Sequence, residues 1–242
     1  MSFKELTIVI TTFKSSKVIE NCLNSIKKEC KVIVVENSND KNFKIYIEKN
    51  YNNVTCVLSG SNLGYSKGNN IGLSMVKTKY ALVLNPDTLL ETNAIENFLS
   101  RVKNNFDFHL IGPANDQQKK IDNIKEDLIE VENLKGFAIF FNLEKFDKIF
   151  FDENYFLYFE EIDLCKRIKE NDGKIYLDKK IIINHRGAQS VDTTSNHELE
   201  KNRNWHWMWS TYYFSKKFKG SVIAIIEIFP KLLSALYKYI FY

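Results

Sequence analysis

Hydrophobic and polar positions in the first half of the chain fall into short apolar runs separated by longer mixed segments. Four apolar runs predict buried strands: 6–11, 31–37, 53–59 and 80–87. The segments between them predict helices: 15–28, 41–50 and 66–76. Strands that alternate with helices indicate a doubly wound α/β sheet, in which ligands bind beyond the carboxyl ends of the strands.

After residue 105 the pattern changes to short strand-like pieces around a single helix. The pieces are 107–113, 119–124, 127–132, 135–142 and two within 174–187. A helix begins within 155–171 and ends at the Asp-Gly pair that follows. No linker rich in Pro, Gly or Ser separates the two halves, so we expect one domain over 1–195, divided into 1–105 and 106–195. A helical segment over 196–242 would follow it.

The composition is that of a globular protein, with 44% hydrophobic and 26% charged residues among 242. A formal net charge of +4 does not require nucleic acid, but it favours an anionic partner such as a phosphate ligand or a membrane surface. The four cysteines form no CxxC pair, and the N-terminus lacks the pattern of a signal peptide. We therefore expect neither a zinc site nor a redox motif, and a reducing, cytoplasmic compartment.

Glycine is concentrated after the third predicted strand. Four of the nine glycines fall within 59–72, at every fourth position, with three asparagines among them. The polar residues exclude a membrane helix-packing motif, and the glycine spacing excludes a dinucleotide fingerprint. Two interpretations remain. Gly68 and Gly72 bring a helix close to the sheet, or Gly60 and Gly64 turn the chain so that the N-terminus of the next helix faces an anion.

A proline-containing turn, LNPDT at 84–88, ends the fourth strand. Pro86 fixes its own φ angle and helps to project the carboxylate of Asp87 from the strand tip. This carboxylate would repel a diphosphate unless a divalent cation lay between them. Mg²⁺ commonly binds one or two carboxylates together with substrate phosphates, so the turn is a candidate metal site. A plain turn without a ligand is the alternative.

Six segments occur in a fixed order along the chain: TIVITTFK, VVENSND, NLGYSKGNN, LVLNPDT, YFLYFEEIDLCKRI and NHRGAQS. Together they resemble the landmarks of family two inverting glycosyltransferases with the GT-A fold, and most closely the bacterial rhamnosyltransferase-like branch. The resemblance covers about residues 5 to 215. It implies a Rossmann-like, doubly wound mixed sheet with a nucleotide-sugar half over 1–105 and an acceptor half over 106–195.

The resemblance also implies where the donor binds. The residues lining the nucleoside pocket would be Thr11, Phe13, Glu36 and Asn37. The residues holding the sugar and diphosphate would be Asn62, Gly64, Lys67, Gly68 and Asn69. Glu36 stands where the family usually has Asp, so the base preference of the nucleotide site stays open, with a dTDP- or UDP-sugar as the expected donor.

For the metal, the resemblance implies Mg²⁺ or Mn²⁺ held by Asp87, which matches the last acid of the family's DxD motif. Asn85 replaces the first acid of that motif. His185 would contact the metal or the leaving diphosphate, although a lone histidine at a strand end is as often structural. Arg186 would offset phosphate charge.

A second acidic cluster, Glu160, Glu161 and Asp163, lies at the start of the predicted helix. Acids are favoured in a first helical turn, and an i, i+4 pair with Arg167 is the simpler interpretation for Asp163. Inverting transfer needs a base that takes a proton from the acceptor hydroxyl, and a partly apolar site can raise a carboxyl pKa toward that task. The family's catalytic Asp aligns with Glu161, so we expect Glu161 to be the base and keep Glu160 as the second candidate. Gly136 matches the family's segment under the acceptor site.

The segment 221–242 is too polar and too interrupted to indicate a membrane span. On a helix its polar residues form one narrow stripe: Glu227, Lys231, Ser234 and Lys238. Tryptophans and tyrosines in 205–214 and lysines in 216–219 favour a membrane interface with anionic headgroups. We expect an in-plane membrane anchor, with packing on the body or on the partner of a homodimer as the alternatives.

These features predict an inverting, metal-dependent hexosyltransferase that moves a sugar from a nucleoside diphosphate to a hydroxyl of a bacterial surface glycan, such as lipopolysaccharide. By the resemblance, the sugar would be rhamnose-like. The acceptor would be lipid-linked, and the protein would be peripheral on the inner face of the cell membrane. A sugar-nucleotide pyrophosphorylase is disfavoured, because TTFKSSKV lacks the glycines and arginines of that loop. A non-catalytic nucleotide-sugar-binding or membrane-assembly partner stays open, because the metal motif is reduced to NPD.

Overall fold

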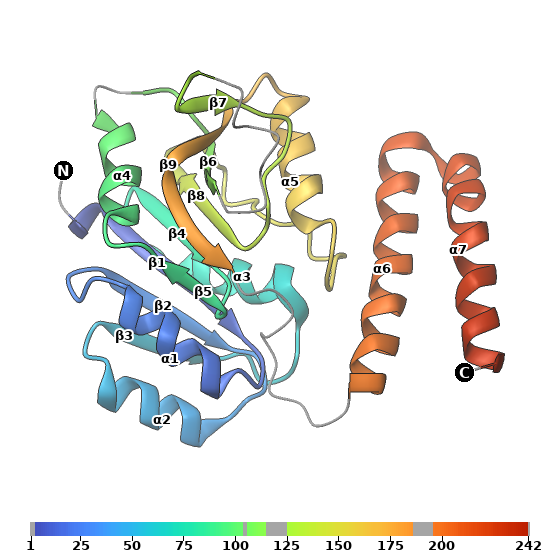
Figure 1. Ribbon diagram of the computed structural model, residues 1–242, viewed down its shortest axis with the longest axis horizontal. Coiled ribbons are helices and arrows are strands. Elements are labelled where there is room, and N and C mark those ends of the chain that lie inside the picture. Colours follow the sequence, from blue (N-terminus) through green and yellow to red (C-terminus); the bar gives the residue numbers. More distant parts are fainter. Residues whose placement is uncertain (1–2, 104–105, 115–124, 186–195, 242) are drawn as a thin grey trace.

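A central sheet carries helices on both faces, and a two-helix hairpin lies beside it (Figure 1). The computed structural model describes residues 3–103, 106–114, 125–185 and 196–241. Within these residues the strands form one nine-stranded sheet that is parallel on one side and mixed on the other. The predicted α/β fold class is confirmed.

The first half of the chain forms the parallel side of the sheet. Its strands are β1 (Leu6–Thr12), β2 (Lys31–Glu36), β3 (Val54–Leu58) and β4 (Tyr80–Leu84). They pair in the order β3-β2-β1-β4. The helices between them are α1 (Ser16–Ser25), α2 (Lys41–Asn50) and α3 (Gly64–Met75). The four predicted strands and three predicted helices are confirmed, with α3 beginning two residues earlier than expected.

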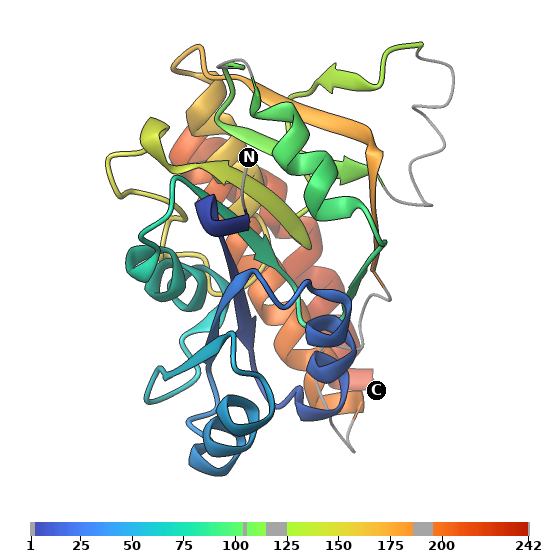
Figure 2. The ribbon, with the colours of Figure 1, turned by 90° about the vertical axis from the view of Figure 1, so that its left-hand side faces the viewer.

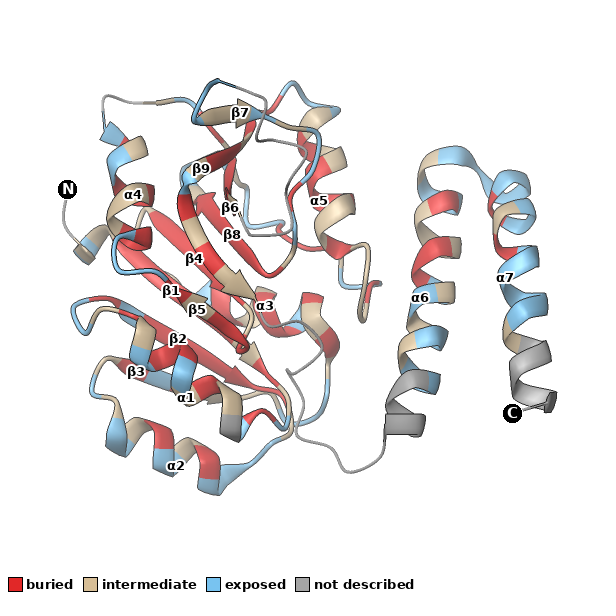
Figure 3. Ribbon diagram, in the orientation of Figure 1, coloured by how far each residue is buried: buried red, intermediate tan, exposed pale blue. Residues whose placement is uncertain are grey.

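Alternate side chains of the parallel strands point to opposite faces and build two cores. On one face, Ile8 and Ile10 of β1 pack with α1, with α2 and with α4 (Ala94–Arg101), a helix that the sequence pattern did not predict. On the other face, Val9 packs with α3 and with α5 (Glu160–Lys169). Because both faces are covered, the inner strands are buried along almost their whole length (Figure 3).

On the other side of β4 lie the strands of the second half and, at the far edge, one short strand of the first half. In spatial order they are β8 (Ala138–Asn142), β6 (Leu110–Ala114), β9 (Ile175–His185) and β5 (Thr88–Leu90), while β7 (Leu128–Glu130) pairs with β9 outside this order. The expectation of two strand pieces within 174–187 is wrong. A single strand runs through, and its register against β6 shifts between Pro113 and Ala114. The expected strand at 119–124 lies outside the described residues.

The C-terminal helices α6 (Asn196–Lys219) and α7 (Ser221–Phe241) form an antiparallel hairpin that turns at Gly220 (Figure 1). Gly220 has a φ of +91°, which favours glycine. α6 lies against the segment before α5, where the Ser210 hydroxyl donates to the Leu157 carbonyl at 2.8 Å. Figure 2 shows both helices behind the sheet. Among the residues described, no helix is both long and apolar enough to cross a bilayer.

Candidate active site

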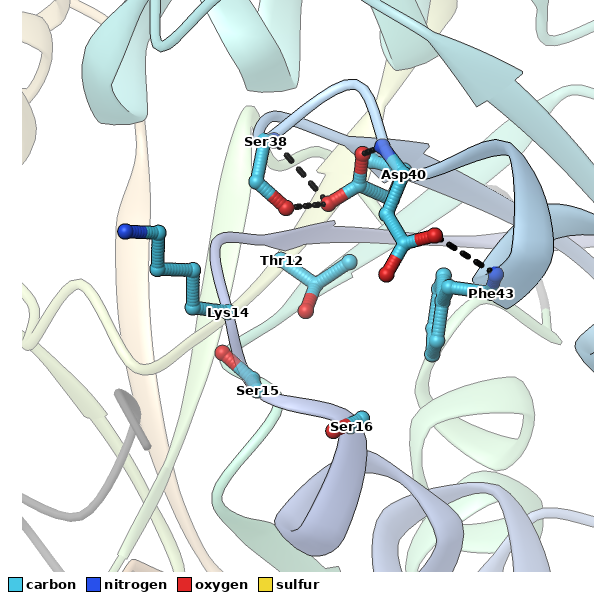
Figure 4. A pocket seen from close by; sticks show the side chains of 8 residues that line it. Thr12, Lys14, Ser15, Ser16, Ser38, Asp40 and Phe43 are labelled. Carbon is cyan, nitrogen blue, oxygen red and sulfur yellow. Dashed lines mark hydrogen bonds between the residues drawn. The ribbon is translucent and has the colours of Figure 1, made fainter. Parts of the chain in front are cut away.

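A pocket of about 250 Å³ opens at the carboxyl ends of β1 and β2 (Figure 4). The residues that line it are Thr12, Lys14, Ser15, Ser16, Glu36, Ser38, Asp40 and Phe43. In Figure 4 the Lys14 side chain lies at one side of the pocket and the Phe43 ring at the other. The pocket therefore lies at the predicted edge of the sheet and offers a cation, hydroxyl groups and an apolar ring to a ligand.

Glu36 shapes the loop that forms one wall of this pocket. The side chain is buried, and its Oε1 accepts hydrogen bonds from the backbone N–H of Ser38 at 2.9 Å and from the Ser38 hydroxyl. Its Oε2 accepts from the N–H of Asp40 at 2.6 Å. The carboxylate thus holds residues 37–40 in place, and a direct contact between Glu36 and a nucleoside stays a prediction.

Two adjacent threonines at the end of β1 have different partners. Thr11 donates its hydroxyl to the side-chain carbonyl of Asn69 at 2.9 Å, so it ties β1 to α3. Thr12 points to the other face, where its buried hydroxyl lines the pocket without a hydrogen-bond partner among the described residues. Sequence reasoning assigned the ligand role to Thr11, which stays a prediction, and gave none to Thr12, although the alternation of side chains along a strand separates the two. Phe13 is half-buried beside them, with the Lys14 ammonium 5.5 Å from its ring centroid.

Asn37 and Asn62 fix the turn that leads into α3. The buried amide of Asn37 donates to the carbonyl of Gly64 at 3.0 Å and accepts from the N–H of Leu63 at 3.2 Å. Asn62 accepts from the N–H of Gly64 at 3.2 Å. Gly64 has a φ of +79°, and a Cβ there would lie 2.3 Å from the carbonyl oxygen of Phe156. The tight turn expected at this glycine is confirmed.

The first N–H groups of α3 are less available to an anion than the sequence indicated. The N–H of Gly64 is bonded to Asn62, and that of Tyr65 donates to the carbonyl of Phe156 at 2.8 Å. The expectation of free donors is therefore wrong for these two groups. Lys67 is exposed one turn further on, and the place it would take at a diphosphate stays a prediction.

Two glycines on α3 let the helix approach the sheet. A Cβ on Gly68 would lie 2.4 Å from Cγ2 of Thr11, and one on Gly72 would lie 2.4 Å from Cγ1 of Val9. Asn69, between them, donates its side-chain amide to the carbonyl of Tyr65 at 3.0 Å. The close-packing interpretation of these glycines is therefore confirmed, while ligand contacts by Gly68 and Asn69 stay predictions.

The turn after β4 brings Asp87 next to His185. The Asp87 carboxylate is buried, with 1% of its side chain exposed, and neither oxygen has a hydrogen-bond partner among the described residues. The His185 Nε2 lies 3.3 Å from Asp87 Oδ1 and 3.4 Å from the side-chain amide nitrogen of Asn85. The Phe137 ring stacks on the imidazole, with centroids 4.9 Å apart and planes 7° apart. Arg186, the next expected residue, lies outside the described residues.

This pair fits part of a metal-binding site. A buried carboxylate without a hydrogen-bond donor is costly, and a cation beside it would satisfy both oxygens. Over the described portion of the chain, no group of three or more His, Cys, Asp or Glu side chains converges as a metal site. Any cation held by Asp87 and His185 would therefore need ligands from elsewhere, and Mg²⁺ and similar ions often take them from substrate phosphates and water.

Two carboxyl groups lie at the start of α5. Burial raises the pKa of Glu161, and this effect is opposed by the backbone N–H groups around it and by the charge of Lys135. Burial also raises the pKa of Glu160 well above its usual range, and repulsion by Glu161 adds to the effect. Glu160 Oε2 has no hydrogen-bond partner among the described residues. Glu161 is the more exposed of the two, so it is the better placed to meet a substrate.

Residues 136–137 contact both the start of α5, which carries Glu161, and His185, the neighbour of Asp87. A Cβ on Gly136 would lie 3.4 Å from the carboxyl carbon of Glu161, so Gly136 is a neighbour of this carboxyl, and its place under an acceptor stays a prediction. The next residue, Phe137, stacks on His185 and accepts a hydrogen bond from the N–H of Asn85 at 2.8 Å. The carboxyl of Glu161 and the Asp87–His185 pair therefore flank one short stretch of chain.

Tyr65 was missed by sequence reasoning and contacts the same stretch. Its hydroxyl donates to the carbonyl of Gly136 at 2.5 Å. Burial raises the pKa of Tyr65 well above its usual range, and the nearby Glu160 and Glu161 carboxyl groups raise it further. The residue lies inside the glycine stretch, but the sequence carries no signal that its ring reaches the second half of the chain.

The chain is strained immediately before the acidic residues of α5. Tyr158 and Phe159 both have a φ of 71°, a conformation that costs a non-glycine residue about 1–3 kcal/mol. The ring of Trp207 on α6 packs on both residues, at 5.4 and 5.3 Å between centroids. Such strain is often found at functional sites, and here α6 helps to hold it.

Asp163 has a structural task. It is fully buried and pairs with Arg167 at 2.7 Å and with Lys217 of α6 at 2.6 Å. The predicted i, i+4 pair is confirmed. Together with the Trp207 contacts, this ion pair links the C-terminal hairpin to the helix that carries Glu161.

A mixed sheet with a pocket at the ends of its parallel strands, and with acidic groups after β4 and at the start of α5, is typical of the class of GT-A glycosyltransferases. The chain belongs to glycosyl transferase family 2, whose sequence profile matches residues 7–164. The family and the fold expected from the six segments are confirmed. The rhamnosyltransferase-like branch stays a prediction.

Two characterised proteins are similar in sequence. One is the low-salt glycan biosynthesis hexosyltransferase Agl10 of Haloferax volcanii, 24% identical over 254 residues that cover 94% of this chain and 77% of that protein. The other is the teichoic acid poly(glycerol phosphate) polymerase of Staphylococcus epidermidis, 32% identical over 108 residues that cover 41% of this chain and 15% of that protein. Both names concern the synthesis of glycans or related polymers.

Solved structures agree on the fold. One is the mannosyltransferase PcManGT from Pyrobaculum calidifontis in complex with GDP-Man and Mn²⁺. It superposes with a TM-score of 0.66 at 13% identity, over 97% of this chain and 74% of that chain. Residues 1–349 of TarS from S. aureus give a TM-score of 0.58 at 16% identity, covering 96% of this chain and 79% of that one. At such identities the likeness supports the fold alone.

Proposed function

We propose that this glycosyltransferase transfers a sugar, with inversion, from a nucleoside diphosphate to a hydroxyl group of a glycan acceptor. The observation that carries the proposal is the short stretch 136–137. Phe137 stacks on His185, the imidazole next to the buried Asp87 carboxylate, which has no hydrogen-bond donor among the described residues. Gly136 contacts Glu161, a carboxyl of raised pKa. The first arrangement suits a cation at a diphosphate, and the second suits a base at an attacking hydroxyl.

The donor nucleoside would occupy the pocket at the ends of β1 and β2. Its Phe43 ring can pack on a base, and Thr12 offers an unpartnered hydroxyl. The solved structures named above include complexes with GDP-Man, and another TarS structure is a complex with UDP. We expect a dTDP- or UDP-sugar, with the diphosphate running from the pocket toward Asp87.

A divalent cation, Mg²⁺ or Mn²⁺, would be held by Asp87 and His185. When bound, it would neutralise charge that develops on the leaving diphosphate. Asn85 contributes no carboxylate at this site, so the protein's own affinity for the cation should be low and should rise with the donor present. The stacked Phe137 ring keeps the imidazole of His185 turned toward Asp87.

Glu161 would act as the base. It takes the proton from the acceptor hydroxyl while the hydroxyl oxygen forms a bond to the anomeric carbon. The bond from that carbon to the diphosphate oxygen breaks on the opposite side, and the nucleoside diphosphate leaves with the electron pair. This displacement inverts the anomeric carbon. Glu160, whose pKa is raised further by burial, would stay protonated beside it.

The acceptor would be a lipid-linked bacterial surface glycan, and the enzyme would work as a peripheral protein on the inner face of the cell membrane. The names of the two relatives, which concern glycan biosynthesis and a teichoic acid, support a cell-surface polymer. The rhamnose-like donor sugar is supported by the resemblance of the six segments alone.

The proposal is tested by donor hydrolysis. The full chain is incubated with dTDP-rhamnose or with UDP-sugars, with and without Mn²⁺, and the released nucleoside diphosphate is measured. We expect release for at least one donor, stimulation by Mn²⁺, and loss of that stimulation in Asp87→Asn. Donor binding without release in any mixture would instead support the non-catalytic nucleotide-sugar binder, which the single acid of the NPD turn keeps open.

A further inference from the structure

α7 buries only a narrow apolar strip, Ala224 and Ile228, and leaves most of its apolar side chains in solvent. Val222 is 72% exposed, Ile223 43%, Ile225 56%, Ile226 65%, Phe229 57%, Leu232 45% and Leu233 52%. They recur at intervals of three and four residues, so most of them lie on one side of the helix. Figure 3 shows α7 as mostly exposed, in contrast to the buried sheet.

Two polar side chains of α7 reach α6 while staying partly in solvent. Glu227 accepts from the hydroxyl of Ser215 and pairs with Lys219 at 2.7 Å. Lys231 lies 3.5 Å from the hydroxyl of Thr211 and 5.8 Å from the ring centroid of Trp207. In water this arrangement leaves a large apolar surface exposed. Such a surface usually marks a contact with another protein or a membrane.

The charge of the protein is concentrated in the same hairpin. Residues 196–242 contain seven Lys and Arg and three Asp and Glu, and the rest of the chain contains 27 of each. The formal net charge of +4 therefore belongs entirely to the hairpin. A second copy bound through this face would bring two positive segments together, whereas an anionic lipid surface would attract both the charge and the apolar face.

All three tryptophans of the protein lie on α6, and each keeps a large part of its surface in solvent. Trp205 is 60% exposed, and Trp207 and Trp209 are each 45% exposed. Tryptophan favours the boundary between headgroups and acyl chains, because its ring is apolar and its N–H is polar. These partly exposed tryptophans, of which Trp207 lies next to Lys231 of α7, again fit a bilayer surface.

We propose that α7 lies along the surface of an anionic lipid bilayer, with its outward face between the headgroups and the acyl chains. Lysines of the hairpin, including the exposed Lys216, would contact the headgroups. This proposal rests on the proposed function and extends it, because it identifies the face through which the enzyme would bind a membrane that carries its acceptor.

The hairpin is also connected to the candidate active site through α6. Lys217 pairs with Asp152 at 2.7 Å and with Asp163 at 2.6 Å, and the His206 ring stacks on Phe156 at 4.2 Å. These contacts hold the segment that leads into Glu160 and Glu161. When α7 is seated on the bilayer, α6 fixes the position of the base relative to the lipid surface.

The test is co-sedimentation of the full chain with vesicles. One set contains phosphatidylcholine alone, and the other contains phosphatidylcholine and phosphatidylglycerol in equal parts. The test variant is Ile225→Gln/Ile226→Gln. The matched control, Ile45→Gln/Ile149→Gln, replaces two isoleucines of the body that are 66% and 69% exposed. Neither pair changes the charge, and all four positions are solvent-exposed, so folding should be unaffected.

We expect the wild type and the control to bind the anionic vesicles, and the test variant to bind them about tenfold more weakly or worse. Equal binding of all three proteins, or no binding by the wild type, would overturn the proposal. A dimer in analytical ultracentrifugation that only the Ile225/Ile226 variant dissociates would assign the face to a second copy. Donor hydrolysis without vesicles is measured separately, so a failure of the proposed activity is distinguished from a failure of membrane binding.

Discussion

Asp87 and Glu161 are linked through residues 136–137, but the two carboxyl groups have different neighbours. Glu161 contacts Gly136, and the partner of Asp87, His185, stacks on Phe137. Asp87 is buried next to an imidazole and receives no hydrogen bond within the described part of the chain. Glu161 packs on Gly136, and burial raises its pKa. Two carboxyl groups in such different surroundings can carry different tasks at the same pH. This difference in surroundings supports the proposed division of tasks, with a cation site at Asp87 and a base at Glu161.

Replacing Glu161 by Gln should lower turnover about 10²–10⁴-fold, because the amide keeps the shape of the side chain but cannot accept the proton of the acceptor. Donor affinity should change little, since the base contacts the acceptor. The measurements are product formation and the shift of the melting temperature by the donor. In the wild type, turnover should fall as the pH drops below the raised pKa of Glu161. Turnover that survives in Glu161→Gln would move the base to Glu160.

The raised pKa of Glu160 predicts how the stability of the protein depends on pH. Its pKa is raised above the ordinary 4.5 in the folded protein, so the folded state keeps the proton to higher pH than the unfolded chain does. The stabilising contribution of this group is therefore fully present at pH values below its pKa in the unfolded chain. It is lost as the pH rises through its pKa in the folded protein. Glu160→Gln cannot ionise, so it should be more stable than the wild type at mildly alkaline pH.

The gain should appear as a higher melting temperature of the variant, because ionising the buried wild-type carboxyl is unfavourable in the folded state. Melting temperatures of both proteins are compared at mildly alkaline and at acidic pH, where the advantage should vanish. The same difference at both pH values would mean that Glu160 is not linked to proton binding.

At the scale of helices and strands, the glycines of α3 allow this helix to pack closely on β1. Its glycines remove side chains at the places where the helix meets Thr11 and Val9 of β1. The close contact brings the start of α3 near Phe156 and lets Tyr65 reach Gly136. The helix thus places the donor half of the site against the half that carries the base.

Gly72→Ala should therefore destabilise the protein by about 1–3 kcal/mol, because the new Cβ would lie 2.4 Å from Val9. The control is Ser74→Ala on the exposed side of the same helix, which should change stability by about 0.5 kcal/mol or less. Urea unfolding measures both. An unchanged stability together with a loss of donor binding would support a ligand role for this glycine instead.

The local sequence pattern predicted the helices and strands that have a clear hydrophobic periodicity. It did not predict elements whose formation depends on tertiary contacts. α4 has only eight residues and no side-chain cap hydrogen bond, so its formation depends on burying Ile95 and Phe98 against the sheet. In the site, the positions of Asp87 and Glu161 follow from the ends of a strand and a helix. Whether the amide of Asn37 bonds to a ligand or to backbone depends on a neighbour 27 residues away, which periodicity does not reveal.

At the scale of the whole molecule, the protein has two regions that differ in charge and surface. The body has equal numbers of acidic and basic residues, while the hairpin carries the net positive charge and the outward apolar face of α7. α6 connects the two through Trp207, Lys217 and the strained residues before α5. The proposed membrane surface and the proposed base are thus linked by one helix.

The two contributions to membrane binding should separate with salt. Raising the ionic strength to about 1 M shortens the Debye length to about 3 Å and weakens the lysine contribution, while the apolar contribution of α7 is not reduced. Wild-type binding to the anionic vesicles should therefore fall several-fold but persist, whereas binding of Ile225→Gln/Ile226→Gln should be lost. The body control Ile45→Gln/Ile149→Gln should follow the wild type. Wild-type binding that disappears completely at high salt would mean that the apolar face of α7 stays out of the bilayer, and binding indifferent to salt would remove the lysines from the contact.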